Sequence, residues 1–268
     1  MRSIQVEKVA VVLAMLLIHT ALWAKDDPNT KWDTFLRPQY FGNQKIIESN
    51  DVIEITAPYR AEDPAMVPIK ISSKIERESK KSIQQLILLI DENPEPFVGE
   101  FKFFQQGGRA DLAMRVRINA YSHVRVIARL NNGELHMNKV FVKASGGCSA
   151  PISADLAAAM KRLGKMKFRV DKDSSAQLPL RTQLLISHPN ITGMQMDQVT
   201  RLVKPAHFMN HMDISFNGEK ILSAKTDIAV SEDPNFRFYF VPGGPGMLKA
   251  EIRDNTGANY SATVDVMP

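Results

Sequence analysis

Cysteine is almost absent from this chain of 268 residues, since Cys148 is the only one. A single thiol cannot form a disulfide within its own chain, and the sequence has no Cys-x-x-Cys-His haem attachment site. It also lacks a phosphate-binding glycine loop, a dinucleotide-binding fingerprint and a Gly-x-Ser-x-Gly nucleophile elbow. We therefore expect no cofactor and a protein that is not an enzyme.

Charge of one sign is not concentrated in any stretch of the sequence. The 34 basic residues stand against 29 acidic residues, which gives a formal net charge of +5. Because the two signs are mixed along the chain, the sequence predicts a solvated surface and no nucleic-acid partner.

Residues 1–24 have the features of an export signal. A short, basic-biased start precedes an apolar run from Val9 to Trp23, and Ala24 offers a small residue at the cleavage position. The run is shorter than the roughly 20 residues that a transmembrane helix needs. We predict cleavage after residue 24, a periplasmic mature protein and no membrane attachment. An uncleaved membrane anchor is the alternative.

Short strand-like segments fill both halves of the sequence. In the first half they cover 51–56, 66–72, 85–90, 97–104, 112–120, 122–130 and 136–142. In the second half they cover 180–187, 207–216, 220–229, 235–241, 248–254 and 260–266. Between the halves, residues 153–163 predict a helix that Ser153 caps and Gly164 ends. The pattern predicts an all-β protein with two β-sandwich domains, 25–151 and 178–268, joined by a short helical linker, 152–177.

The lone cysteine follows two glycines, Gly146 and Gly147, at the end of the first predicted domain. Glycine frees the backbone, and an unpaired cysteine in an exported protein indicates covalent chemistry or an intermolecular disulfide. A small buried hydrophobe is the alternative. Basic residues outnumber acidic ones six to three between 153 and 173, and positive charge near a thiol favours the thiolate.

A second cluster combines histidine with methionine. His207, Met209 and His211 alternate along one predicted strand, with Met194 and Met196 upstream. Soft thioether ligands suit Cu(I), so the cluster raises copper delivery as an alternative function. Methionine as core filler explains the same pattern.

The first half carries a set of recognisable motifs. They are Val67-Pro68-Ile69, Ile90-Asp91-Glu92-Asn93-Pro94-Glu95-Pro96, Arg115-Val116-Arg117-Ile118-Asn119 and Gly146-Gly147-Cys148. With these motifs, residues from about 50 to 151 resemble SoxY, the sulfur-carrying subunit of the periplasmic thiosulfate-oxidising system.

The second half carries a matching set. The motifs are Ile186-Ser187-His188-Pro189, Pro205-Ala206-His207-Phe208, Phe216-Asn217-Gly218 and Asn235-Phe236-Arg237-Phe238. Here residues from about 180 to 268 resemble SoxZ, the partner subunit. The whole is similar to the fused SoxYZ-like carriers associated with quinoprotein (PQQ-dependent) dehydrogenases.

The resemblance implies two immunoglobulin-like sandwiches and a carrier cysteine on a mobile arm. Cys148 would be the covalent attachment site, Gly146 and Gly147 would give the arm its freedom, and the cargo would be a small sulfur-containing group. Sulfur-oxidation enzymes or a PQQ-dependent dehydrogenase would be the partners. One feature departs from the family, because Cys148 lies in mid-chain and its arm is held at both ends.

Overall fold

The computed structural model describes residues 29–75, 79–151, 156–171, 179–197 and 200–267. The predicted signal peptide lies outside these residues. The chain divides into two compact units between Gly42 and Asn43, and the described residues of the first unit are 29–42. In the first unit, a π-helix, η1 (Trp32–Leu36), leads into α2 (Arg37–Phe41), and the rings of Trp32 and Phe41 are 6.0 Å apart. In the described part of the chain, no helix combines the length and apolar character that crossing a membrane requires.

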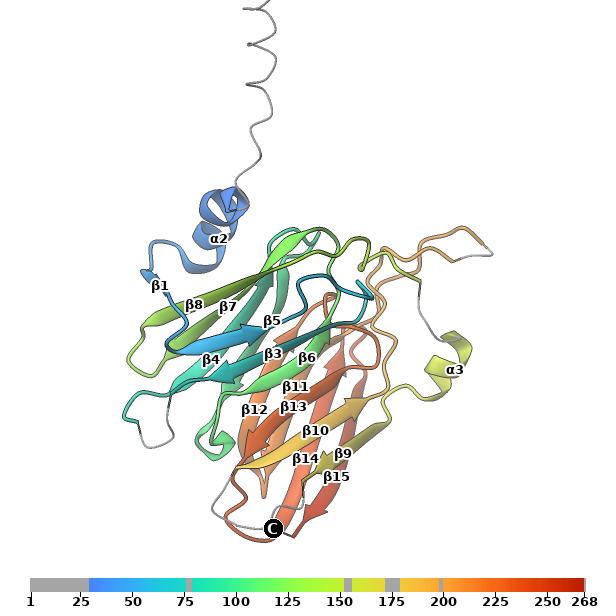
Figure 1. Ribbon diagram of the computed structural model, residues 1–268. Helices are drawn as coiled ribbons and strands as arrows, with labels where there is room; N and C mark the ends of the chain where they lie inside the picture. Colours follow the sequence, from blue (N-terminus) through green and yellow to red (C-terminus); the bar gives the residue numbers. More distant parts are fainter. Residues whose placement is uncertain (1–28, 76–78, 152–155, 172–178, 198–199, 268) are drawn as a thin grey trace, which may run out of the picture. The chain divides into compact units, whose positions relative to one another are not determined.

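The described residues of the second unit form two β-sheets, which Figure 1 shows as stacked layers. The larger sheet has the order β1 (Ile46–Glu48), β8 (Leu135–Val142), β7 (Ser122–Leu130), β4 (Ile83–Ile90), β5 (Phe97–Phe103), β12 (Glu219–Thr226), β11 (Met209–Phe216), β14 (Gly246–Asp254) and β15 (Asn259–Val266). The smaller sheet has the order β2 (Ile53–Thr56), β3 (Val67–Ser73), β6 (Leu112–Val116), β13 (Asn235–Phe240), β10 (Leu180–Ile186) and β9 (Met166–Val170). The predicted all-β sandwich class is confirmed.

Strands from both halves of the sequence pair within each sheet. In the larger sheet β5 pairs antiparallel with β12, with Phe101 opposite Ala224. In the smaller sheet β6 pairs with β13, with Ala113 opposite Arg237. The colours of Figure 1 show this directly, since green strands lie beside orange and red ones in both layers. Each sheet therefore runs without a break from the first half of the sequence into the second.

The core fills the space between the two sheets. Alternation along each strand points one set of side chains inward, as in β10, where the residues at 180, 182, 184 and 186 are buried. Phe101 of the larger sheet and Phe236 of the smaller sheet are fully buried, with ring centroids 6.3 Å apart. Since these two rings come from different halves of the sequence, the halves share one hydrophobic core.

The region predicted as a linker contains one helix and one strand. Helix α3 covers Leu156–Lys161, and Gly164 has the left-handed φ of +76° that ends a helix. The predicted cap, Ser153, lies outside the described residues. Strand β9, which the sequence did not predict, pairs with β10 at the edge of the smaller sheet. Backbone hydrogen bonds of Gly164 and Lys165 with Ser187, followed by the pairing of β9, hold the described chain from Gly164 to the end of β9.

Candidate functional site

Cys148 lies in a turn that follows β8, and the structure holds this turn against the end of β6. The N–H of Gly146 donates to the carbonyl of Asn119 (2.8 Å), and the N–H of Gly147 donates to the carbonyl of Ile118 (3.0 Å). The N–H of Cys148 contacts Oδ1 of Asn119 at 3.4 Å. The segment is therefore docked, and the Cys148 side chain points inward with 1% of its surface exposed.

The two glycines of the arm have different roles in this docked state. Gly146 has open space around its Cα and a φ of +79°, a left-handed backbone conformation that is strained for residues with a Cβ. Gly147 is enclosed by backbone: a Cβ placed there would overlap the carbonyl oxygen of Pro64 and lie 2.6 Å from that of Ile118. The sequence predicted freedom of movement at both positions, whereas the structure shows that Gly147 permits close packing.

A pair of asparagines positions the surface on which the arm rests. Nδ2 of Asn93 donates to the carbonyl of Arg117 (2.9 Å), and Oδ1 of Asn93 accepts the N–H of Asn119 (2.8 Å). Asn93 is 1% exposed, so these bonds lie in a protected environment. Asn119 in turn contacts the arm through its main chain and side chain. The turn after β4 thus fixes the residues that receive the Cys148 arm.

The second half of the sequence also holds the arm. Oγ1 of Thr192 donates to the carbonyl oxygen of Cys148 at 2.6 Å. Thr192 is buried, and its own N–H donates to Oε1 of Gln195 at 2.9 Å. The SoxY-like and SoxZ-like halves therefore meet at the peptide group of the lone cysteine.

Arg117 is the charged group beside the thiol. Its side chain is fully buried, and Nη1 donates to the carbonyl of Gly147 at 3.3 Å. Burial raises the pKa of the Cys148 thiol from 9.0 to about 11, and the positive charge of Arg117 opposes that rise. In the docked state the thiol is therefore protonated at neutral pH and closed to solvent.

The sequence left open whether the basic segment after Cys148 activates the thiol or is a solvated linker helix, and the described part of that segment does not lower the pKa of Cys148. Two influences shift the pKa of Cys148: burial raises it, and the positive charge of Arg117 lowers it. The described basic residues between 156 and 171 do not contribute, and burial outweighs the arginine. Arg117, Asn93 and Thr192 were not predicted as site residues. Two of them lie in the motifs quoted above, but nothing in the sequence assigned them a role.

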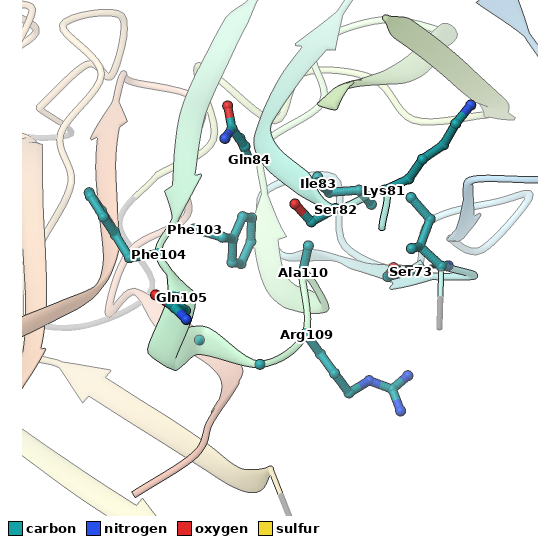
Figure 2. Close-up of a pocket in the computed structure, with 13 residues that line it drawn as sticks. Ser73, Lys81, Ser82, Ile83, Gln84, Phe103, Phe104, Gln105, Arg109 and Ala110 are labelled. Carbon is teal, nitrogen blue, oxygen red and sulfur yellow. Dashed lines mark hydrogen bonds between the residues drawn. The ribbon is translucent and has the colours of Figure 1, made fainter. Parts of the chain in front are cut away.

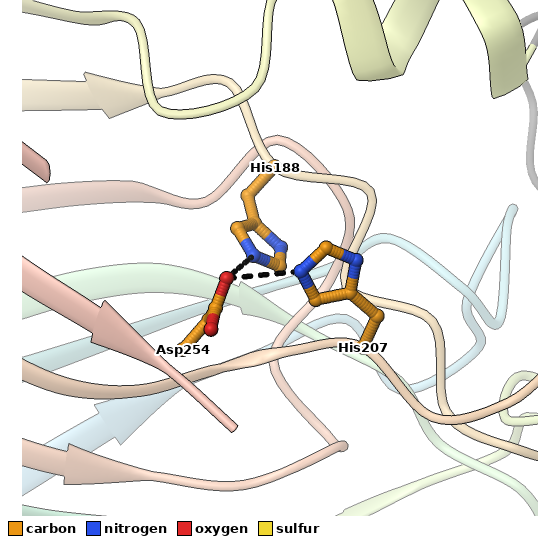
Figure 3. Close-up of side chains that lie close together, drawn as sticks. All are labelled: His188, His207 and Asp254. Atoms are coloured by element: carbon orange, nitrogen blue, oxygen red, sulfur yellow. Dashed lines mark hydrogen bonds and ion pairs between the residues drawn. The ribbon is translucent and has the colours of Figure 1, made fainter. Parts of the chain in front are cut away.

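His188 and His207 converge on Asp254 at the end of β14, as Figure 3 shows. Nε2 of His207 is 2.9 Å from Oδ2 of Asp254, and Nε2 of His188 is 3.7 Å from the same oxygen. Burial would raise the pKa of Asp254, but hydrogen bonds from Thr256, from His207 and from the N–H of Ala258 lower it to about 2. The cluster therefore contains a buried carboxylate that faces two imidazoles.

The donor chemistry of this cluster does not fit a metal bound by both histidines. The N–H of Asn190 donates to Nδ1 of His188 at 3.1 Å, so the proton of a neutral His188 lies on Nε2, the atom that faces Asp254. A metal would need the lone pair of that nitrogen. Burial and the nearby His207 lower the pKa of His188 to about 4.

The methionines of the copper interpretation, Met194, Met196 and Met209, differ in burial. Met209 is a fully buried member of the hydrophobic core, Met194 is half-buried and Met196 is exposed. What the histidine cluster does is fix the loop that precedes β11. Asn190 ties this loop to Val230 and Ser231, and the same loop presents Thr192 to Cys148.

A surface pocket lies at the opposite strand ends from Cys148 (Figure 2). Ser73 at the end of β3 and Lys81 before β4 line it, together with Arg109 after η2 (Gln105–Gly107). The segment that carries Cys148 instead lies against Pro64, which precedes β3, and against Ile118 and Asn119, which follow β6. A strand of seven residues spans about 23 Å, so the pocket belongs to a separate region.

The fold and the site define a class of protein: an all-β sandwich with a lone buried cysteine on a segment between the two halves of the sequence. The family models agree with this class. Residues 37–148 match "Sulfur oxidation protein SoxY" and residues 168–265 match "Sulphur oxidation protein SoxZ". The chain is a fusion that contains a SoxY domain and a SoxZ domain. The SoxY match ends at Cys148 itself.

Solved structures give weaker similarities. The sulfur carrier protein SoxY from Chlorobium limicola f thiosulfatophilum shares 23% identity, with a TM-score of 0.35, and the match covers 44% of this chain and 94% of that one. A superoxide reductase (neelaredoxin) from Ignicoccus hospitalis shares 16% identity, with a TM-score of 0.33, covering 37% and 93%. No curated protein matches the chain. The assignment therefore rests on the two family models.

Proposed function

We propose that this protein is a periplasmic carrier that holds a small sulfur-containing group covalently on Cys148 and presents it to partner enzymes. One observation supports this most: the single cysteine lies where the SoxY and SoxZ domains meet, in a segment held by hydrogen bonds from both. The predicted signal peptide supports the periplasmic location. The protein itself supplies the thiol and its surroundings, and the partner supplies the redox chemistry.

Loading with thiosulfate is a two-electron oxidation. The Cys148 thiol loses its proton, and a bond forms between Sγ and the sulfane sulfur of thiosulfate. Two electrons pass to a redox-active partner enzyme, which leaves a thiosulfonate group on the cysteine. Because the docked thiol has a pKa of about 11 and 1% exposure, loading requires that the arm first leave its docked position.

The fused topology limits how far the arm moves. Gly164 and Lys165 are fixed by backbone hydrogen bonds to Ser187, so the segment between Cys148 and this anchor covers residues 149–163. Fully extended, it would span about 50 Å at about 3.3 Å per residue. Helix α3 shortens it, since a helix rises only about 1.5 Å per residue. On its other side Cys148 follows Lys143 by five residues, and Lys143 is bonded to Tyr59 and Ala61, so this shorter side limits the reach to about 16 Å. We expect such a reach to suit a shallow cleft of a partner.

Two kinds of partner fit the family. Sulfur-oxidation enzymes are the first, and they follow from the SoxY and SoxZ domains. A PQQ-dependent dehydrogenase is the alternative, and it follows from the similarity to the quinoprotein-associated fusions. A copper-delivery role has no support in the geometry, because Met209 is in the core while Met196 is exposed, and His188 lacks a free lone pair towards Asp254.

Intact mass spectrometry tests the proposal. The wild-type protein and Cys148→Ser are incubated with thiosulfate and an oxidase of the sulfur-oxidation system. We expect the mass of one thiosulfonate group on the wild type, removed by dithiothreitol, and no addition on the variant. An identical adduct on Cys148→Ser would contradict the proposal, as would an unmodified wild type in a reaction where the oxidase loads another carrier.

A further inference from the structure

Arg117 is a buried cation, and some of its N–H groups donate no hydrogen bond to the described residues. Its side chain has no exposed surface, and Nε and Nη2 have no hydrogen-bond partner among the described residues. Nη1 donates to the carbonyl of Gly147, the residue whose peptide bond leads into Cys148. The guanidinium thus lies against the backbone of the carrier cysteine with two N–H-bearing atoms unpaired.

Such an arrangement is costly in the unloaded protein. Burying a charged donor without a partner is among the more expensive features in a folded chain. Burial lowers the pKa of Arg117, while the charges of Glu232 and Asp63 raise it and so favour the cation. These carboxylates compensate the charge, but they do not occupy Nε and Nη2. The site therefore has unused capacity for an anion in the unloaded state.

We propose that Arg117 is the binding group for an anionic sulfur adduct on Cys148, such as a terminal sulfonate or a persulfide. This inference rests on the proposed carrier function and names the charge of the cargo. Arginine presents its N–H groups in a planar fork that matches oxyanions, and hydrogen bonds between charged groups are the stronger kind. A neutral thiol cannot satisfy this fork, whereas an anion attached at Sγ can.

The consequence is that the charge of the cargo decides how firmly the loaded arm docks. An anionic adduct pairs with Arg117 in a buried site and favours the docked state. A neutral adduct of similar size leaves the guanidinium unpaired and favours release. The carrier would therefore retain charged intermediates and present the cysteine more readily after the charged group has been removed.

Two reagents that label the thiol test the effect of charge directly. With tetrathionate, the thiolate attacks an inner sulfur, thiosulfate leaves, and an anionic S-thiosulfonate forms. With methyl methanethiosulfonate, the thiolate attacks the sulfenyl sulfur, methanesulfinate leaves, and a neutral methyl disulfide forms. Intact mass confirms complete labelling, and thermal unfolding is then measured. For the wild type we expect the anionic form to melt about 4 °C or more above the neutral form.

Variants of the arginine separate its role from general stability. In Arg117→Gln the difference in melting temperature between the anionic and the neutral adduct should disappear or change sign. Arg117→Lys should restore part of this difference. Arg115→Gln, which removes a half-buried arginine of β6, should keep the wild-type difference. If Arg117→Gln fails to fold, the difference in melting temperature between the two adducts, measured in the wild type and in Arg117→Lys, still tests the proposal.

An equal melting temperature for both adducts of the wild type would overturn the inference, and so would an unchanged difference in Arg117→Lys and Arg117→Gln. Neither result bears on the carrier function, because both reagents label Cys148 without a partner enzyme. Failure of enzymatic loading with thiosulfate, tested as above, would instead overturn the carrier proposal and leave the measured charge preference standing.

Discussion

Replacing Gly147 by alanine should release the Cys148 arm from its docked position. The added Cβ would overlap the carbonyl oxygen of Pro64 and lie 2.6 Å from that of Ile118. Both contacts are backbone atoms, which cannot rotate away as a flexible side chain would. Overpacking of this kind costs about 1–3 kcal/mol, which is similar to the few hydrogen bonds, each worth about 1 kcal/mol, that hold the arm. The variant should therefore populate the undocked arm.

The expected gain in thiol reactivity follows from the pKa. If undocking lowers the pKa of Cys148 from about 11 to its ordinary value of 9.0, the thiolate fraction at neutral pH rises about 100-fold. A thiolate of lower pKa is a weaker nucleophile, and this offsets about 10-fold of the rise. The net gain is about 10-fold from ionisation, and access to the buried sulfur adds to it.

Labelling with 5,5′-dithiobis(2-nitrobenzoic acid) in excess measures this rate. Gly133→Ala is the control for an added methyl group away from the arm, because Gly133 lies in the hairpin between β7 and β8 with open space around it, whereas Gly147 is enclosed by backbone. Thr192→Val should give a smaller rise of about fivefold, since it removes one hydrogen bond to the arm. A wild type that reacts as fast as the unfolded chain would refute the reasoning. A folded Gly147→Ala with an unchanged rate would do the same.

The structure makes three further predictions. Asp91→Asn should lower the free energy of unfolding measured in urea by about 3 kcal/mol or more, because it breaks the fully buried ion pair between Asp91 and Arg125. Asp171→Asn, which breaks the exposed pair with Arg181, should change it by under about 1 kcal/mol. Equal effects of the two variants would contradict the prediction. Between pH 6.5 and 4 the wild type should lose up to about 3 kcal/mol of its free energy of unfolding, because His188 takes up a proton in the unfolded state while its pKa in the folded state is about 4. His188→Asn should make this loss smaller, and His211→Asn should leave it unchanged. A wild-type stability that does not change over this pH range would contradict the prediction. Phe236→Ala should cost about 3–5 kcal/mol while calorimetry still shows a single transition, and two separate transitions would disprove the shared core.

Most strands could be predicted because apolar and polar residues alternate along them, which indicates the face of each strand that packs against the core. In β2 the buried and exposed residues alternate strictly from Ile53 to Thr56, as the sequence indicated. The Asn217-Gly218 turn was also predictable, since both residues have the positive φ of a tight hairpin. Strands β1 and β9 were missed because they are short or half-exposed edge strands, whose local pattern is weak.

The sharing of both sheets between the two halves could not be predicted. Each half shows complete strand patterns, so the sequence alone reads as two sandwiches. The pairing of β5 with β12 joins residues more than 100 positions apart, and local periodicity carries no information about such partners. The predicted domain boundaries stay predictions, although the family models place their own division between 148 and 168.

The central residue of the candidate site, Cys148, stays a prediction, and its surroundings were not predicted. Rarity alone singled out Cys148, and the motif assigned it a carrier role. The glycine pair was ambiguous, because a sequence does not distinguish a glycine needed for freedom from one needed for close packing. Arg117 was invisible as a site residue, since a charged side chain in a strand is normally assigned to the solvent face.

The mass of Cys148 in protein from its native cells tests the carrier role most directly. Cells oxidising thiosulfate are quenched in acid with a thiol-blocking reagent, and the peptide that contains Cys148 is analysed by mass spectrometry. We predict that part of this peptide carries sulfur-containing additions that dithiothreitol removes, and that these additions decline when thiosulfate is withdrawn. A peptide that carries only the blocking reagent under both conditions would contradict the account.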